Sequence, residues 1–584
     1  MKQTNRKLQS TLNFGALLIA VIVANILGNF YYKRIDLTAE KRYTLSETSN
    51  NLASKLDEKL YFRLYLEGEM SPRFKRLKME IRDLILEFRE ASNGKIEFEV
   101  VNPFTGVGDK EMEEVLESYS NKGINPVRDV DKENPDETRI KYLLPGAQLF
   151  YKNQTVSVNF FDYDVGLDPE ANISRAIDNI EYEVANALRL VTTEQKKRVV
   201  VADGNGEMIY EGFESLAQEL QKYYDISALN MNFRDPNSAL PWAEQIMADR
   251  ENAETIFING LHRRLNSNDL LMVVKPISDY TEQELYLIDQ FIMQGGKVLW
   301  LIDPVRIEID SFRNYKQVLA QNYGLENITA SLFHYGVGIK NSLLMDQKCN
   351  RIPIPAAGRM ELIDFPYFPL FQESSFSHII TKNMGTVWSQ FPATLDPKVR
   401  PTLNMYPLLV SSPYSKVITT PAPVDLETIY MNMKDPDYRQ SLRQGEQLSG
   451  VLVEGQFRSK FKFMKKYGNI KHLDSGSGQM IVIADGDIAR NPSGSRGATF
   501  PTGYDKISGL TFSNKKFMLN CIDYLLEGKG LIEIRAKERK LRLLDPEKSR
   551  LEKSYWQWYS ILAPVGIMLF FGLINYFIRN KRYT

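Results

Sequence analysis

The sequence has little cysteine and little histidine. Cys349 and Cys521 are the only cysteines among 584 residues, and the four histidines are scattered along the chain. Two cysteines are too few for a disulfide framework, and neither residue type shows the spacing of a zinc site. No Cys-x-x-Cys pair occurs, so thiol redox chemistry is excluded. The sequence leaves open whether Cys349 and Cys521 pair, and it predicts no metal and no cofactor.

Net charge and nucleotide-binding motifs are absent as well. Lys and Arg number 73, as do Asp and Glu, so no basic field favours nucleic acid. The nearest approach to a P-loop, Gly295-Gly296-Lys297-Val298, lacks both the upstream glycine and the hydroxyl that cradle phosphates. No Gly-x-Ser-x-Gly elbow is present, and neither cysteine follows a predicted sheet strand. These absences predict a protein without catalytic residues; a hydrolase is the least favoured of three hypotheses.

Two long apolar runs stand out against this balanced composition. The run from Trp558 to Ile578 contains no charged residue. At roughly 1.5 Å per residue it is about 31 Å long, which matches the hydrocarbon core of a bilayer. Tyrosines and tryptophans precede it and a basic tail follows it, as is typical of membrane helices. We expect a membrane helix over residues 557–578 and a short tail over 579–584.

The second run, Phe14 to Phe30, lies near the other end of the chain. A basic start before an apolar stretch also suits a cleaved signal peptide, but this stretch is long and no Ala-x-Ala site follows it. We expect an uncleaved membrane helix over residues 14–32, after a tail of residues 1–13. Small residues recur along it every four positions, at Ala16, Ala20, Ala24 and Gly28. Such a stripe lets two membrane helices pack closely, although alanine and glycine are common enough to produce it without that role.

The region between the two runs divides into two α/β parts. Residues 35–195 contain strand patterns at 60–66 and 96–101, a helical pattern from Pro72, and a hairpin pattern at 147–160. A long helix begins at Asp168-Pro169. This order predicts a thioredoxin-like α/β domain.

The second part has short buried runs alternating with helices, a pattern typical of a doubly wound, flavodoxin- or amidotransferase-like parallel sheet. We place this sheet in residues 196–326 and 479–530. Residues 327–478 form an insertion of loops and short strands, and 531–554 form a charged juxtamembrane segment. The predicted strands are 199–203, 255–259, 270–274, 297–303 and 480–485.

Polar side chains follow these predicted strands. They are Asp203, Asn259, Asp303, Asp485 and Asp487. Ligands of open parallel sheets bind at the carboxyl ends of the strands, so these residues could line a crevice that binds a cation or sugar hydroxyls. The simpler interpretation, which we favour, is that Asp-Gly pairs cap the loops leaving the strands.

Several segments resemble the GldG family, the gliding-motility auxiliary (substrate-binding-like) proteins of ABC transporters in Bacteroidetes. They are residues 34–46 (RIDLTAEKRYTLS), 65–68 (YLEG), 74–77 (FKRL) and 483–491 (IADGDIARN). The resemblance implies an inner-membrane protein with two spans, cytoplasmic ends and a periplasmic bulk. It also implies a GldF-like ABC permease, a GldA-like ATPase and membrane lipid as partners, and it transfers no catalytic residues. The charges flanking the spans do not by themselves decide this topology. The alternative function is an envelope ligand-binding or cell-wall-sensing module that uses the acidic crevice.

Overall fold

The protein is a mixed α/β structure, as the sequence predicts. The computed structural model describes residues 14–23, 44–108, 111–131, 139–161, 168–193, 195–209, 211–356, 359–372, 378–382, 384–494, 499–528, 530–535 and 550–583. The chain forms two compact units, Met1–Lys537 and Glu538–Thr584. The first holds the sheets, and the second holds a single long described helix.

The first sheet of the larger unit has four strands in the order β2-β1-β5-β6. β1 (Leu60–Leu64) runs parallel to β2 (Ile96–Val100) and antiparallel to β5 (Gly146–Tyr151), which forms a hairpin with β6 (Gln154–Asn159). A separate hairpin, β3 (Val127–Asp131) with β4 (Arg139–Leu143), was not predicted. The predicted strands and hairpin of this part are therefore present, whereas its thioredoxin-like assignment stays a prediction.

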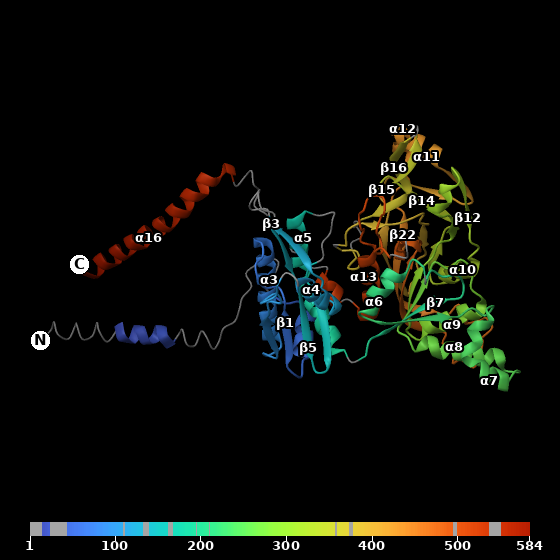
Figure 1. The fold of residues 1–584 in the computed structure, drawn as a ribbon, viewed down its shortest axis with the longest axis horizontal. Helices are drawn as coiled ribbons and strands as arrows, with labels where there is room; N and C mark the ends of the chain where they lie inside the picture. The colour runs from blue at the N-terminus through green and yellow to red at the C-terminus, as the bar shows by residue number, and fades with distance from the viewer. Residues whose placement is uncertain are drawn as a thin grey trace. The chain divides into compact units, whose positions relative to one another are not determined.

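The helices α2 (Glu47–Ser54), α3 (Pro72–Ala91) and α5 (Pro169–Thr192) pack on this sheet in one core. α5 begins as expected, because Asp168 accepts a hydrogen bond from the backbone N–H of Ala171 and Pro169 occupies the first turn. α4 (Met112–Asn121) contributes to a smaller cluster around Tyr65. In Figure 1 this part of the chain is drawn in blue to teal.

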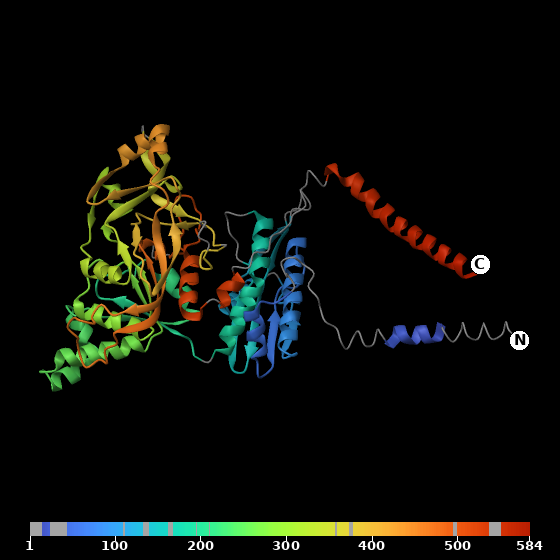
Figure 2. The ribbon, with the colours of Figure 1, turned by 180° about the vertical axis from the view of Figure 1, so that it is seen from behind.

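The second sheet has seven strands in the order β19-β22-β23-β10-β9-β7-β8. The five from β23 to β8 are parallel, and β22 and β19 are added antiparallel. Figures 1 and 2 show the late, orange strands lying in one sheet with the earlier, green ones. The strands are β7 (Arg198–Asp203), β8 (Asp225–Asn230), β9 (Leu270–Val274), β10 (Lys297–Leu301), β19 (Leu403–Val410), β22 (Leu448–Arg458) and β23 (Ser475–Ile483).

Helices cover both faces of this sheet because its strands are apolar on both sides. Along β7, Val200 and Ala202 face one core with α8 (Ala253–Asn266) and α9 (Glu282–Met293). Val199 and Val201 face another core, with α6 (Glu214–Gln221) and α13 (Asn514–Glu527). The expected capping box of α9 is present, with Thr281 and Glu284 bonded reciprocally. Parallel strands with helices on both faces match the predicted architecture; the flavodoxin- or amidotransferase-like assignment stays a prediction.

One predicted strand is wrong. Residues 255–259 lie inside the helix α8, and the sheet strand that the sequence analysis missed is β8. Phe257, Ile258, Leu261 and Leu265 are buried at helical spacing, so the β-branched run 255–259 is part of a longer amphipathic pattern. Gly260 does not end a strand. A Cβ there would lie 2.3 Å from the Trp242 ring, so glycine allows that ring to pack against the helix.

The region predicted as an insertion of loops and short strands is more ordered than expected. It supplies β19 and β22 to the large sheet, and β22 has 11 residues. Its own core is built around the long hairpin of β15 (Cys349–Ala356) and β16 (Arg359–Phe371). Other elements there include α10 (Glu326–His334), β14 (Ser342–Asp346), β20 (Ser415–Thr419), β21 (Ala422–Asp425), α11 (Leu426–Lys434) and α12 (Pro436–Ser441). β12 (Gln317–Asn322), which precedes this region, pairs with β21. Cys349 and Cys521 are both free.

The short helix α14 (Gly530–Arg535) joins the two cores of the larger unit. Leu531 and Ile534 are buried in the core of the first sheet, whereas Ile532 is buried with α13 and the second sheet. At its start, Gly530 lies close to α2, where a Cβ would be 3.2 Å from Thr48. The segment predicted to lead directly into the membrane therefore begins as part of the first domain.

Among the described residues, one helix is long and apolar enough to cross a membrane. It is α16 (Lys553–Tyr583), whose apolar part Lys553–Ile578 has a mean hydropathy of 2.1 and no buried share. The first apolar run is helical over Phe14–Val23. Ala16 and Ala20 lie in that helix, but Ala24 and Gly28 lie outside the described residues. The second membrane span thus stays a prediction.

Candidate functional site

The carboxyl ends of three neighbouring strands hold a buried cluster of charges. Asp303 follows β10, Asp485 and Asp487 follow β23, and their carboxylate oxygens lie within 4.8 Å of one another. Because β23, β10 and β9 are adjacent and parallel, their ends meet at one edge of the sheet. The structure therefore brings together three of the five candidate residues.

A lysine that the sequence analysis did not select lies among them. Lys275 directly follows β9, and its ammonium group is 2.8 Å from both carboxylate oxygens of Asp487. It is 3.2 Å from Asp303 and 2.9 Å from Glu308. Arg490 adds a second cation, 2.9 Å from Glu308 and 3.3 Å from Asp487. The position that a bound cation would take is therefore held by the protein's own lysine.

The remaining lone pairs of the cluster are used by hydrogen bonds within the protein. Asp485 accepts from the Ser389 hydroxyl, from the backbone N–H of Gln390 at 3.0 Å, and from that of Asp487 at 2.8 Å. Asp303 accepts from the backbone N–H of Gly486 at 2.6 Å. Asp485 is 0% exposed, Asp487 6% and Asp303 7%, so none of the three faces an open crevice.

Burial and the neighbouring charges shift the pKa values of the clustered residues in different directions. Burial by itself would lower the pKa of Lys275, but Asp487, Asp303 and Glu308 raise it well above its ordinary value. Burial raises the pKa of Asp303 to about 6 despite the neighbouring Lys275. Burial and the two other aspartates raise the pKa of Asp485 well above the ordinary carboxyl value. Burial would also raise the pKa of Asp487, but Lys275 and Arg490 hold it below that value. The two cations therefore favour the ionised form of Asp487, whereas burial and the neighbouring aspartates disfavour that of Asp485.

The backbone fits this ion pair closely. Lys275 has a φ of 50°, in the left-handed region that residues with a side chain rarely adopt. Its N–H donates to the carbonyl of Leu301 at 2.8 Å, which fixes it to the end of β10. A Cβ at Gly486 would lie 2.5 Å from the Lys275 Cβ, so glycine lets the loop after β23 approach the lysine. The pair Asp485-Gly486 thus allows the loop after β23 to pack against Lys275.

The other two predicted site residues lie elsewhere. Asp203 ends β7 and accepts a hydrogen bond at 2.7 Å from the N–H of Gly204, as a loop cap would. In the same loop Glu207 is hydrogen-bonded by Tyr280, and burial raises the pKa of Glu207. Asn259 lies within α8, where its side-chain oxygen accepts from the N–H of Asn469 at 2.9 Å. It cannot mark a strand end, because residues 255–259 are helical.

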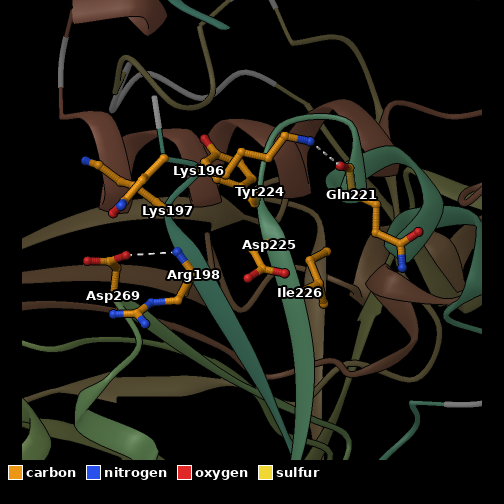
Figure 3. A pocket seen from close by; sticks show the side chains of 9 residues that line it. Lys196, Lys197, Arg198, Gln221, Tyr224, Asp225, Ile226 and Asp269 are labelled. Carbon is orange, nitrogen blue, oxygen red and sulfur yellow. Dashed lines mark hydrogen bonds between the residues drawn. The ribbon is translucent and has the colours of Figure 1, made fainter. Parts of the chain in front are cut away.

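The opposite, amino-terminal edge of the same sheet has a cavity of about 870 Å³. Figure 3 shows its side chains, which come from the starts of β7 and β8 and the residues just before them, from the end of α6, and from the loop before β9. The lining residues are Gln195, Lys196, Lys197, Arg198, Gln221, Tyr224, Asp225, Ile226 and Asp269. The sequence analysis used Lys196-Lys197-Arg198 only as a domain boundary; three consecutive cations directly before a buried strand were the available signal.

These features define a class: an α/β protein with a helix of membrane-spanning length and a parallel sheet whose carboxyl edge is closed by its own ion pairs. Residues 196–521, more than half of the chain, match the family described as "ABC-type uncharacterized transport system" (ABC_transp_aux). The chain therefore belongs to this family of ABC transporter auxiliary proteins. Residues 39–149 match a domain of unknown function, DUF7088.

A full-length relative and a solved structure are also similar to the chain. An uncharacterized protein of Borreliella burgdorferi is 21% identical over 595 aligned positions, which cover 99% of both chains. The solved "mmIFT52 N-terminal domain" is 12% identical, with a TM-score of 0.32, and the match covers 57% of this chain and 99% of that one. A likeness of that degree supports no conclusion about fold or function.

Proposed function

We propose that this protein is a non-catalytic, membrane-anchored auxiliary subunit of an ABC transporter. Membership of the auxiliary family supports the transporter. The observation that carries the anchoring is α16, whose apolar part of 26 residues has no share buried by the protein. A helix of that length and composition needs a bilayer or another apolar surface. The two ends lie in the cytoplasm and the sheets lie outside the inner membrane, with residues 14–32 as the second span.

The non-catalytic part of the proposal rests on the carboxyl edge of the large sheet. Open parallel sheets bind substrates at this edge, but here Lys275 fills the space between the aspartates. The alternative function, an envelope ligand-binding or cell-wall-sensing module, would require a ligand to displace that ammonium group from the buried carboxylates of Asp303 and Asp487. Breaking a buried ion pair costs about 3–5 kcal/mol, so the arrangement favours a structural role.

The proposed partners are a GldF-like permease and a GldA-like ATPase, because the chain has no P-loop of its own. The segments at 34–46 and 483–491 that resemble the gliding-motility proteins support a role in gliding motility. The residues Ala16, Ala20, Ala24 and Gly28 are the proposed contact of the first span with a permease helix.

Co-purification from mildly solubilised membranes tests this function. A tagged chain should bring down the permease and the ATPase, and replacing 14–32 with a poly-leucine span of equal length should release them while the chain stays in the membrane. The double variant Ala20→Leu with Ala24→Leu should weaken the association, whereas Leu17→Ala with Leu18→Ala, off the stripe, should not. Recovery of the intact chain without either partner, or from the soluble fraction, would refute the proposal.

A further inference from the structure

The basic cavity at the amino-terminal edge is not explained by the proposed function. We propose that it binds a phosphate-bearing ligand, with Lys196 and Arg198 holding the phosphate and the side chain of Ile226 contacting the rest. The proposal does not depend on assembly with a transporter. It rests on how the cavity is built, on its excess of positive charge, and on which cations are free to bind.

The backbone that carries the cations is fixed at the edge of the sheet. The N–H of Arg198 donates to the carboxylate of Asp269 at 2.9 Å, and the N–H of Asp269 donates to the carbonyl of Arg198 at 2.8 Å. The N–H of Asp225 donates to the carbonyl of Lys197 at 2.9 Å. Both neighbouring segments thus hold the tripeptide 196–198 in place, so its side chains project from a rigid frame around the cavity (Figure 3). A rigid frame lowers the entropic cost of binding a ligand.

The two proposed phosphate ligands have few competing contacts. Within the described ranges, the guanidinium group of Arg198 makes no ion pair, and the ammonium group of Lys196 bonds only the carbonyl oxygen of Gln221, at 2.9 Å. Lys197 differs, because its ammonium group bonds the carbonyl of Leu526 and lies 3.6 Å from Glu527. Lys197 therefore adds positive charge to the cavity, but its ammonium group remains bound to the end of α13.

The cavity has more positive than negative charge. Its lining carries three cations against Asp225 and Asp269, and Asp269 is already used as the acceptor of a backbone N–H. A fourth cation, Lys297, begins β10 next to the start of β9. Burial, and after it the proximity of Lys197, lower the pKa of Lys297, whereas Asp269 and Glu527 act in the opposite direction. A dianionic phosphate would balance the positive charge of the lining.

The size of the cavity indicates a ligand larger than a free ion. A cavity of about 870 Å³ is in the range of small-molecule sites, roughly 300–1,000 Å³. Tyr224 is only 1% exposed and its hydroxyl donates to Asp523 at 2.6 Å, so it fixes the segment before β8 from beneath and presents no surface to the ligand. The guanidinium fork of Arg198 can bond two phosphate oxygens at once, while the ammonium of Lys196 supplies a point charge. The phosphate could belong to a soluble compound or to a lipid headgroup.

Thermal unfolding of the full-length chain in dodecyl maltoside tests the proposal with two probes. The probes are inorganic pyrophosphate and mixed micelles containing phosphatidylglycerol, each compared with sulfate or phosphatidylcholine. Stabilisation by pyrophosphate assigns a soluble ligand, and stabilisation only by phosphatidylglycerol assigns a lipid headgroup. No stabilisation by either probe overturns the proposal.

Matched variants place the binding in the cavity. The double variant Lys196→Gln with Arg198→Gln should bind the active probe at least about tenfold more weakly, because it loses two charge-assisted contacts. The control Lys222→Gln with Arg264→Gln removes the same charges from exposed positions outside the lining and should keep the wild-type affinity. Asp225→Asn should tighten binding, a gain that misfolding cannot produce. Equal affinity of the two double variants would overturn the assignment.

Discussion

Replacing Lys275 with methionine tests whether the cluster at the carboxyl edge is a structural ion pair. Methionine keeps most of the length of the lysine stem but has no charge. The change removes the contacts of 2.8 Å to Asp487 and 3.2 Å to Asp303, and it leaves both carboxylates buried without their main cation. Removing one partner of a buried pair costs about 3–5 kcal/mol. For a domain of this size we expect Tm to fall by about 5–15 °C near neutral pH.

The pH dependence of this loss gives a sharper test. In the wild type, Asp303 has a raised pKa of about 6, so its contribution to stability is present at low pH and lost as the pH rises through 6. Asp487 has a lowered pKa, so its contribution is lost as the pH falls. Without Lys275, burial would raise the pKa of both groups. The variant should therefore be most destabilised at pH 8 and should approach the wild type at pH 5.

Thermal unfolding of the full-length chain in detergent at pH 5 and pH 8 measures both effects. Lys222→Met, which changes an exposed lysine, is the matched control and should leave Tm within about 1 °C. Adding Asp487→Asn to Lys275→Met should restore part of the stability, because it removes one uncompensated charge. A Lys275→Met protein as stable as the wild type at pH 8, or equally destabilised at both pH values, would refute the structural role of the cluster.

Three further substitutions probe the packing. Ile534→Ala in α14 should destabilise the first domain by about 2–4 kcal/mol and speed hydrogen exchange in α5, because Ile534 is buried in that core, whereas the exposed Glu533→Ala should not. Asp523→Asn weakens the acceptor of Tyr224 (2.6 Å), and chemical denaturation should show a loss of about 1–3 kcal/mol. Gly476→Ala would place a Cβ 1.8 Å from the carbonyl oxygen of Met293 and should lower Tm by several degrees; Gly108→Ala, with open space around it, is the control.

Much of the secondary structure was predictable because it depends on patterns within a few residues. The buried run 270–274 is the strand β9, and the capping residues Asp168 and Thr281 begin α5 and α9. The error at 255–259 has the same origin. A short β-branched run fits the period of a strand as well as that of a helix. The buried Leu261 and Leu265 that follow it continue the helical period, and the segment is a helix.

The candidate site was predictable only in part. Asp303, Asp485 and Asp487 were found because the carboxyl ends of neighbouring parallel strands meet. Lys275 was not selected, since a lysine after a strand is usually solvated and its burial depends on Gly486 and on the order of the strands. The prediction that Asn259 lies at the end of a strand was wrong, because residues 255–259 are helical.

The sequence by itself determined the long apolar helix α16, the alternation of strands and helices, and the absence of nucleotide-binding and nucleophile motifs, because each depends on local composition and period. The tertiary structure alone decided that a lysine neutralises the aspartates, that α14 completes the core of the first domain, and that Lys196 and Arg198 border a cavity. These outcomes join residues up to hundreds of positions apart. They depend on strand order and packing, which no local pattern encodes.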